Sequence, residues 1–225
     1  MNAGAIPPPL AGGPLLLDER ASPPLREVIG ALLASAREAC FAVARVRLAG
    51  IDLSASELAG VRRCRVLLGR LDADVLADAE AAARRGELRR NLQVLAAFLA
   101  SGRVEVRAAG LEAWVPDFSV FMGLPADAVP GGCAAIVGGH YFHRPFPVTG
   151  PSLTCVIPGG AAARRAARRF EELWAAAHDV LPVVEDAIAR ALREVGPGEP
   201  VDRIRCRIEG VAPPAGTPGH RGVQP

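Results

Sequence analysis

The stretch CAAIVGGHYF at residues 133–142 contains a short apolar run, then two glycines and a group of polar side chains. An apolar run of this length that ends in glycine is typical of a buried strand. Two further runs of this kind lie at residues 118–122 and 152–157, and the Pro- and Gly-rich residues 123–132 precede Cys133. Three successive strands are therefore predicted in this part of the chain.

Upstream and downstream of these strands, strand and helix patterns alternate. Strand-like apolar patterns occur at residues 41–48, 65–69 and 104–108. Apolar residues at helical spacing predict helices at 22–36, 88–99, 160–177 and 183–193. A capping box at Ser54 to Glu57 predicts the start of a further short helix. This alternation predicts an α/β fold in which helices flank a mixed sheet.

The ends of the chain differ in composition from its middle. Residues 1–24 are rich in proline, glycine and alanine without a period, which predicts a flexible N-terminal tail. The predicted domain covers residues 25–195. Residues 196–225 form a second Gly- and Pro-rich tail, in which apolar residues among arginines at 201–208 predict one short edge strand.

Composition excludes several classes of protein. The 225 residues are 50% hydrophobic, 22% charged and 4% aromatic, as expected for one soluble globular domain. All 26 basic residues counted as lysine or arginine are arginines, so a Walker-type phosphate lysine and a Schiff-base lysine are excluded. No apolar run has the roughly 18 residues that a membrane span needs, and no basic residue precedes Arg20. A cytoplasmic location without a membrane span is expected.

The five cysteines are odd in number, widely spaced and never arranged as Cys-x-x-Cys. We expect free, mostly buried thiols rather than a disulfide framework, because cysteine behaves as a small apolar residue in protein cores.

From about Arg26 to Asp179 the order of elements resembles the phospholipase D-like superfamily, especially its single-domain and helicase-associated members. The resemblance rests on five stretches, which are Ser101 to Arg107, the strand through Phe118, Cys133 to Phe142, Ser152 to Ile157, and Phe170 to Trp174. In that family the same succession gives a strand carrying His-x-Lys, a Gly-Ser-x-Asn turn, a returning strand and a closing helix. The resemblance implies a phospholipase D-like sheet flanked by helices.

The residues that carry the chemistry of that family are replaced. The family's His-x-Lys falls on Val115-Pro116-Asp117, and its Gly-Ser-x-Asn turn falls on Gly138-Gly139-His140-Tyr141. In the family one histidine attacks phosphorus, a second protonates the leaving oxygen, and lysine and asparagine hold the phosphoryl oxygens. A carboxylate at Asp117 would instead repel a phosphate. The resemblance therefore implies a catalytically degenerate module for binding, sensing or assembly, which pairs with itself as an isologous homodimer.

A cluster of polar side chains, His140, Tyr141, His143 and Arg144, falls where the family has its active-site turn. With Asp117 these residues form the predicted ligand-binding set, and the ligand class is one that contains phosphate. Another interpretation is a divergent phosphodiesterase or nuclease, with His140 or His143 as nucleophile or acid and Arg144 holding oxygens. A third is that the histidines make loop hydrogen bonds only.

A metal site would need His140 and His143 together with Cys133 or Cys155. That set is assembled from distant positions, so we expect neither a metal nor a cofactor. No Ser-His-Asp order or Gly-x-Ser-x-Gly elbow supports an esterase.

Four arginines, at positions 164, 165, 168 and 169, lie on one side of the predicted helix at 160–177. Such a face is more often solvated than functional, and Glu171 and Glu172 reduce its field. The net charge of +2 indicates no nucleic-acid partner. Nucleic-acid binding through this face is nevertheless a third hypothesis, which predicts binding that weakens steeply with salt.

Overall fold

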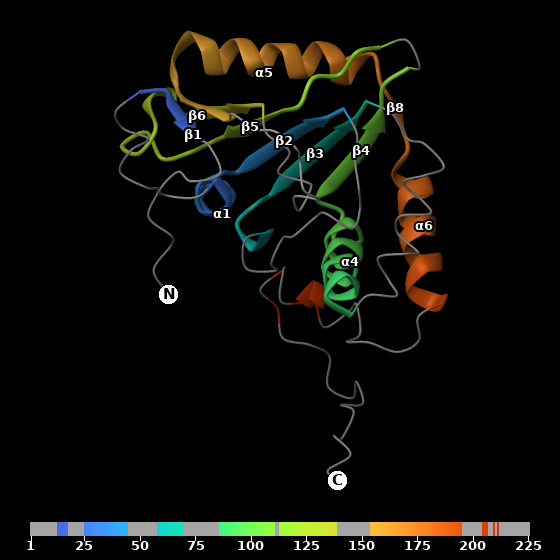
Figure 1. Ribbon diagram of the computed structural model, residues 1–225. Coiled ribbons are helices and arrows are strands. Elements are labelled where there is room, and N and C mark those ends of the chain that lie inside the picture. The colour runs from blue at the N-terminus through green and yellow to red at the C-terminus, as the bar shows by residue number, and fades with distance from the viewer. Residues whose placement is uncertain are drawn as a thin grey trace.

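The computed structural model describes residues 13–17, 25–44, 58–69, 86–110, 113–138, 154–194, 204–206, 209 and 211. Within these residues an eight-stranded sheet lies between helices (Figure 1). The strand order is β1-β7-β6-β5-β2-β3-β4-β8. The strands are β1 (Leu15–Leu17), β2 (Glu38–Val43), β3 (Arg63–Leu68), β4 (Val104–Ala108), β5 (Phe118–Met122), β6 (Cys133–Val137), β7 (Thr154–Pro158) and β8 (His178–Asp179).

The sheet is mixed, as the sequence predicts. Strands β2, β3 and β4 run parallel to one another. On one side of them β5, β6, β7 and β1 follow with antiparallel pairing, and on the other side β8 pairs antiparallel with β4. The prediction of an α/β fold with helices flanking a mixed sheet is confirmed.

The molecule has three layers. Helix α5 (Gly160–Ala175) covers one face of the sheet, and α1 (Leu25–Ser35), α4 (Gly86–Leu99) and α6 (Leu181–Glu194) lie on the other (Figure 1). Successive side chains of a strand point to opposite faces, so each central strand contributes to two cores. This is why β2 is apolar almost throughout, with Ala39 to Val43 all buried.

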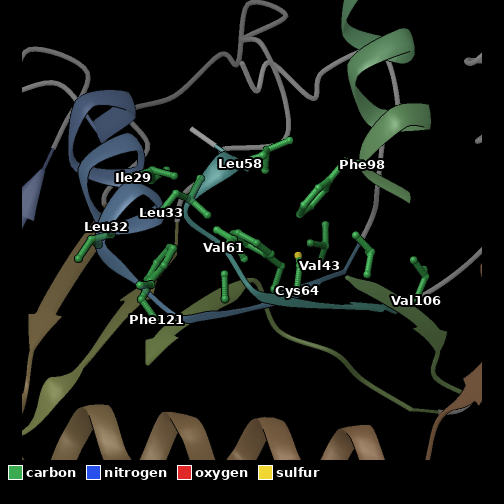
Figure 2. Close-up of a cluster of buried hydrophobic side chains, with 14 of the residues drawn as sticks. Ile29, Leu32, Leu33, Val43, Leu58, Val61, Cys64, Phe98, Val106 and Phe121 are labelled. Atoms are coloured by element: carbon green, nitrogen blue, oxygen red, sulfur yellow. The ribbon is translucent and has the colours of Figure 1, made fainter. Parts of the chain in front are cut away.

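The larger core lies between the sheet and the three helices of one face (Figure 2). Leu32 and Leu33 of α1 are fully buried there, and the Phe41 and Phe121 rings meet edge to face with centroids 5.9 Å apart. Burial of one such side chain stabilises the fold by about 1.5–3 kcal/mol. The helical spacing of apolar residues in α1 and α4 therefore determines which sides of these helices contact the sheet.

The smaller core lies under α5, and small residues line its floor. Cys40 and Ala42 of β2 and Cys133 and Ala135 of β6 are buried beneath the helix. They leave room for the aromatic side chains of α5, of which Phe170 stacks on Trp174 at 5.5 Å between centroids. Small residues on the strands and large ones on the helix thus fill this layer together.

Most of the predicted elements occur within a few residues of their predicted bounds. Strand β2 differs, because it begins at Glu38 rather than at residue 41. A strand that is buried on both faces has no alternation by which its start could be recognised. The capping box at Ser54 to Glu57 lies outside the described residues, which resume at Leu58.

Three segments differ from prediction, of which one is β8, a strand that the sequence does not predict. Leu15 to Leu17, within the predicted N-terminal tail, form β1 and pair with Thr154 to Val156 of β7. Ile204 to Cys206 are helical, so the predicted edge strand at 201–208 is wrong. Alternation over three positions is too short to distinguish a strand from a helix. Arg205 contacts Glu209 at the i,i+4 spacing of a helix.

The five cysteines are free thiols. Burial raises the pKa of the Cys40 thiol to about 12 and also raises the pKa of Cys64 and Cys133 above the ordinary value. These thiols therefore stay protonated and pack as apolar residues. Among the helices that the structure describes, none is long and apolar enough to cross a membrane.

Candidate functional site

The carboxyl ends of the parallel strands meet at one edge of the sheet. Strand β2 ends at Val43, β3 at Leu68 and β4 at Ala108. Antiparallel pairing brings the start of β5 to the same edge, because Phe118 lies opposite both Ala42 and Val137. We call this region the carboxyl edge. In open α/β sheets, ligands bind beyond the carboxyl ends of the strands, so this edge is the candidate site.

Asp117 lies at the carboxyl edge, immediately before β5. Its Oδ1 accepts a hydrogen bond from the backbone N–H of Ala44 at 2.8 Å, where β2 ends. Its carbonyl oxygen accepts another from the N–H of Gly138 at 3.2 Å, where β6 ends. Asp117 therefore connects the ends of three neighbouring strands, and one of its carboxylate oxygens is engaged by the backbone.

The other predicted ligand-binding residues, His140, Tyr141, His143 and Arg144, lie outside the described residues. The structure does describe the two ends of the segment that contains them. Gly138 follows β6, and Thr154 opens β7 beside it, since Val137 lies opposite Cys155. The described chain thus stops at Gly138 and resumes at Thr154 at the carboxyl edge, the edge at which Asp117 lies. That these side chains converge with Asp117 stays a prediction.

The two cysteines considered as metal ligands lie at opposite edges of the sheet. Cys155 pairs with Val137 at the carboxyl edge, whereas Cys133 begins β6 at the opposite end of that strand. Val137 lies four positions after Cys133 along the strand, which corresponds to about 13 Å. Cys133 is also buried. Within the residues that the structure describes, no group of three or more potential metal ligands occurs.

Trp114 is a residue of this edge that sequence reasoning missed. Its side chain is 76% exposed, although the neighbouring Val115 is buried. Val115 packs closely against the backbone that follows β3. A Cβ added at Gly69 would lie 3.1 Å from the Cβ of Val115. A large aromatic side chain is therefore exposed beside the candidate site. Its signal in the sequence is a tryptophan in the short connection between the predicted strands at 104–108 and 118–122, in a chain with few aromatic residues.

A second polar cluster lies beneath α5 and was also missed. Arg65 of β3 is only 5% exposed, and its Nη1 donates to Glu171 Oε2 at 2.9 Å while its Nε lies 2.8 Å from Glu38 Oε1. Its guanidinium also lies 5.1 Å from the centre of the Phe170 ring. The signal in the sequence is an arginine within an apolar strand, because a buried charge requires a partner.

The environment of Arg65 favours its charged form. Burial alone would lower the pKa of the guanidinium, but the hydrogen bonds to Glu171 and the nearby carboxylates raise it above the ordinary value. The same hydrogen bonds lower the pKa of Glu171. Arg107 extends the cluster, since its Nη1 donates to the Trp174 carbonyl at 3.1 Å and its guanidinium lies over the Trp174 ring. The protein itself uses these donors, so the cluster joins α5 to the sheet and offers no open anion site.

No protein-family model matches the chain, and no curated protein matches it. Solved structures are similar in chain path. The phospholipase D family member Nuc from Salmonella typhimurium has a TM-score of 0.46 and 12% identity, over 74% of this chain and 98% of Nuc. The archaeal chromatin protein TrmBL2, described with a novel mode of DNA binding, has a TM-score of 0.45 and 11% identity, over 76% of this chain and 55% of that protein.

A third similar structure is phosphatidylserine synthase from Haemophilus influenzae, with a TM-score of 0.44 and 12% identity over 80% of this chain and 45% of the synthase. The chain thus spans about half the length of two of these proteins. At this identity and TM-score, none of the three identifies an activity or a ligand of this chain.

Proposed function

We propose that this protein is a catalytically degenerate phospholipase D-like domain that works as a binding module for a phosphate-containing ligand at the carboxyl edge. The ligand would contact His140, Tyr141, His143 and Arg144 near Asp117. Arginine and protonated histidine are the donors that suit phosphate oxygens. Binding without hydrolysis requires only that these donors converge.

The observation that carries the proposal is the hydrogen bond from Ala44 N–H to Asp117 Oδ1. The resemblance assigns the position of Asp117 to a lysine that holds a phosphoryl oxygen. A carboxylate that accepts a backbone hydrogen bond there has a structural role, and its charge opposes the stabilisation of a phosphorane-like transition state. This supports loss of the family's chemistry with retention of its scaffold.

The test is a titration of the full chain with inorganic phosphate, followed by NMR of the histidine ring protons. The chain has four histidines, so His178 and His220 serve as internal controls. We expect saturable shifts of the His140 and His143 signals alone, weakened in Arg144→Gln and unchanged in the control Arg193→Gln on α6. Absence of shifts, or equal shifts of all four signals, would overturn the proposal.

The competing function is a divergent phosphodiesterase or nuclease with a site rebuilt from His140, His143 and Arg144. It is favoured by one observation, the start and return of the segment 139–153 at the edge where Asp117 lies. It predicts turnover of an activated phosphodiester that either His→Ala variant abolishes.

We also propose a cytoplasmic homodimer, because the resemblance implies that single-domain members place their site at a two-fold interface. Sedimentation equilibrium is expected to give twice the mass of the chain. A monomer at all concentrations would contradict the dimer and leave the binding module unaffected.

A further inference from the structure

Helix α5 has two opposite sides. Ala163, Phe170 and Trp174 face the sheet and are buried. At 3.6 residues per turn, positions 164, 165, 168 and 169 fall within an arc of about 140° that is centred opposite these buried residues. All four arginines there are exposed. We call them the α5 arginine face, and Figure 1 shows that α5 is the outermost layer on its side of the sheet.

Within the described part of the chain, only one arginine of this face has an ion-pair partner. Arg169 forms an ion pair with Glu172 at 3.0 Å. Arg164, Arg165 and Arg168 form no ion pair with any of the residues that the structure describes. Glu171 does not neutralise them, because it turns toward Arg65 at the side of the helix. The dilution of the face by Glu171 and Glu172 that the sequence indicates is therefore smaller than expected, and three positive charges remain.

Arg164 and Arg165 lie in the second turn of α5, and Arg168 and Arg169 lie near its middle. The first turn contains no acidic residue, and no side chain caps the helix at Gly159. The positive end of the helix dipole therefore has no acidic side chain beside it, and its field acts mainly within that first turn. The field that favours an anionic partner at this face thus comes mainly from the arginine side chains.

The chemistry of the face favours nucleic acid over a lipid surface. A helix that lies in a membrane interface needs large apolar anchors beside its basic residues. The exposed residues of α5 are glycine, alanine, arginine and glutamate, without an exposed large apolar side chain among them. Guanidinium groups on a rigid helix are well suited to the repeated phosphates of a duplex. We propose that the α5 arginine face binds the phosphate backbone of nucleic acid, without reading its sequence.

This inference is independent of the phosphate ligand proposed for the carboxyl edge. Strand β7 leaves that edge at Thr154 and ends at Pro158, so α5 begins at the opposite edge of the sheet. A failed phosphate titration would not contradict nucleic-acid binding by the α5 arginine face. Loss of duplex binding in the variant below would not change the phosphate titration of the histidines.

The test is fluorescence anisotropy of a labelled mixed-sequence DNA duplex of about 20 base pairs, at salt concentrations from about 50 to 200 mM. The variant is Arg164→Gln, Arg165→Gln and Arg168→Gln combined. The control is Arg90→Gln, Arg190→Gln and Arg193→Gln combined, which removes the same charge from exposed positions of α4 and α6 on the other face of the sheet. Melting temperatures of all three proteins verify that they are folded.

We expect the wild type and the control to bind the duplex, with affinity that falls steeply as salt rises. The α5 variant should bind at least about tenfold more weakly at low salt, and the slope of log K against log salt should fall in magnitude by about three. Equal weakening of both variants would attribute binding to net charge and overturn the proposal. It would also be overturned if the wild type failed to bind DNA, or bound phosphatidylserine vesicles in its place.

Discussion

Arg65 shows how one side chain fixes the position of a helix. It extends from the middle of β3 to Glu171 on α5, 106 positions away in sequence, and lies against the stacked rings of Phe170 and Trp174. The charge is buried at one end, while the Glu171 side chain is 54% exposed. Solvent therefore weakens the pair, whose contribution arises mainly from satisfying a buried guanidinium.

We predict that Glu171→Gln lowers the free energy of unfolding by about 1 kcal/mol at neutral pH, after allowance for solvent screening of Glu171. Because the pKa of Glu171 is lowered below its ordinary value of 4.5 in the folded state, the carboxylate stabilises the fold above that value. The difference from wild type should therefore shrink as the pH falls through the lowered pKa. Urea unfolding of both proteins across the acid range measures this difference in the free energy of unfolding.

The matched control is Glu172→Gln, which removes an exposed pair with Arg169 and should have a smaller effect. A difference between wild type and Glu171→Gln that stays constant through the acid range would contradict the assigned role of the carboxylate.

Ser119 is a second buried polar group. It is 1% exposed on β5, and its Oγ makes no hydrogen bond with any residue that the structure describes. We predict that Ser119→Ala raises the free energy of unfolding by about 1 kcal/mol, because it removes an unsatisfied buried hydroxyl. Ser101→Ala should have the opposite sign, since Ser101 Oγ donates to the Phe98 carbonyl at 2.6 Å. A loss of stability in both variants would refute this reading of Ser119.

At the scale of residues, the sequence predicted only part of the candidate site. It singled out Asp117, but the partner of that carboxylate, Ala44, lies 73 positions away, and no local pattern connects them. The same holds for Arg65 and Glu171. Trp114 was missed because its exposure depends on how Val115 packs against Gly69 after folding.

At the scale of elements, the length and periodicity of each segment determined whether the sequence predicted its secondary structure correctly. Strands β5 and β6 have the bounds that their apolar runs predict, because a loop rich in proline and glycine separates them. Strands β1 and β8 have three and two residues and leave no period to detect. Their pairing with β7 and β4 is a consequence of tertiary structure, which also overrode the strand-like pattern at residues 204–206.

The turn that leads into α5 provides a prediction for an element. Gly159 has a φ of 73°, and a Cβ there would lie 2.2 Å from the Pro130 carbonyl oxygen. Gly102, after α4, has a φ of 70° but open space around it. We predict that Gly102→Ala costs about 1 kcal/mol for its backbone conformation. Gly159→Ala should cost about 2 kcal/mol more because of the overlap. Chemical denaturation measures both, and equal losses would contradict the close approach.

At the scale of the whole molecule, the sequence predicts the layers of the fold. It does not predict how the chain connects the candidate site to α5. Alternating helices and strands predict a sheet covered on both faces, and the structure has that arrangement. The sequence does not predict that β7 carries the chain from the carboxyl edge to the other edge before α5 begins. That connection starts α5 at the edge opposite Asp117, and the α5 arginine face lies on the outer side of the helix that covers the sheet.

The central claim is that this scaffold binds without catalysing hydrolysis. The most direct measurement is hydrolysis of bis(p-nitrophenyl) phosphate by purified wild type beside His140→Ala and His143→Ala, with and without a divalent metal. We predict no turnover by the wild type above that of either variant, because the carboxylate of Asp117 accepts the Ala44 N–H where the resemblance assigns a phosphate-binding lysine. Turnover by the wild type that disappears in either variant would contradict the account and identify a phosphodiesterase with a rebuilt site.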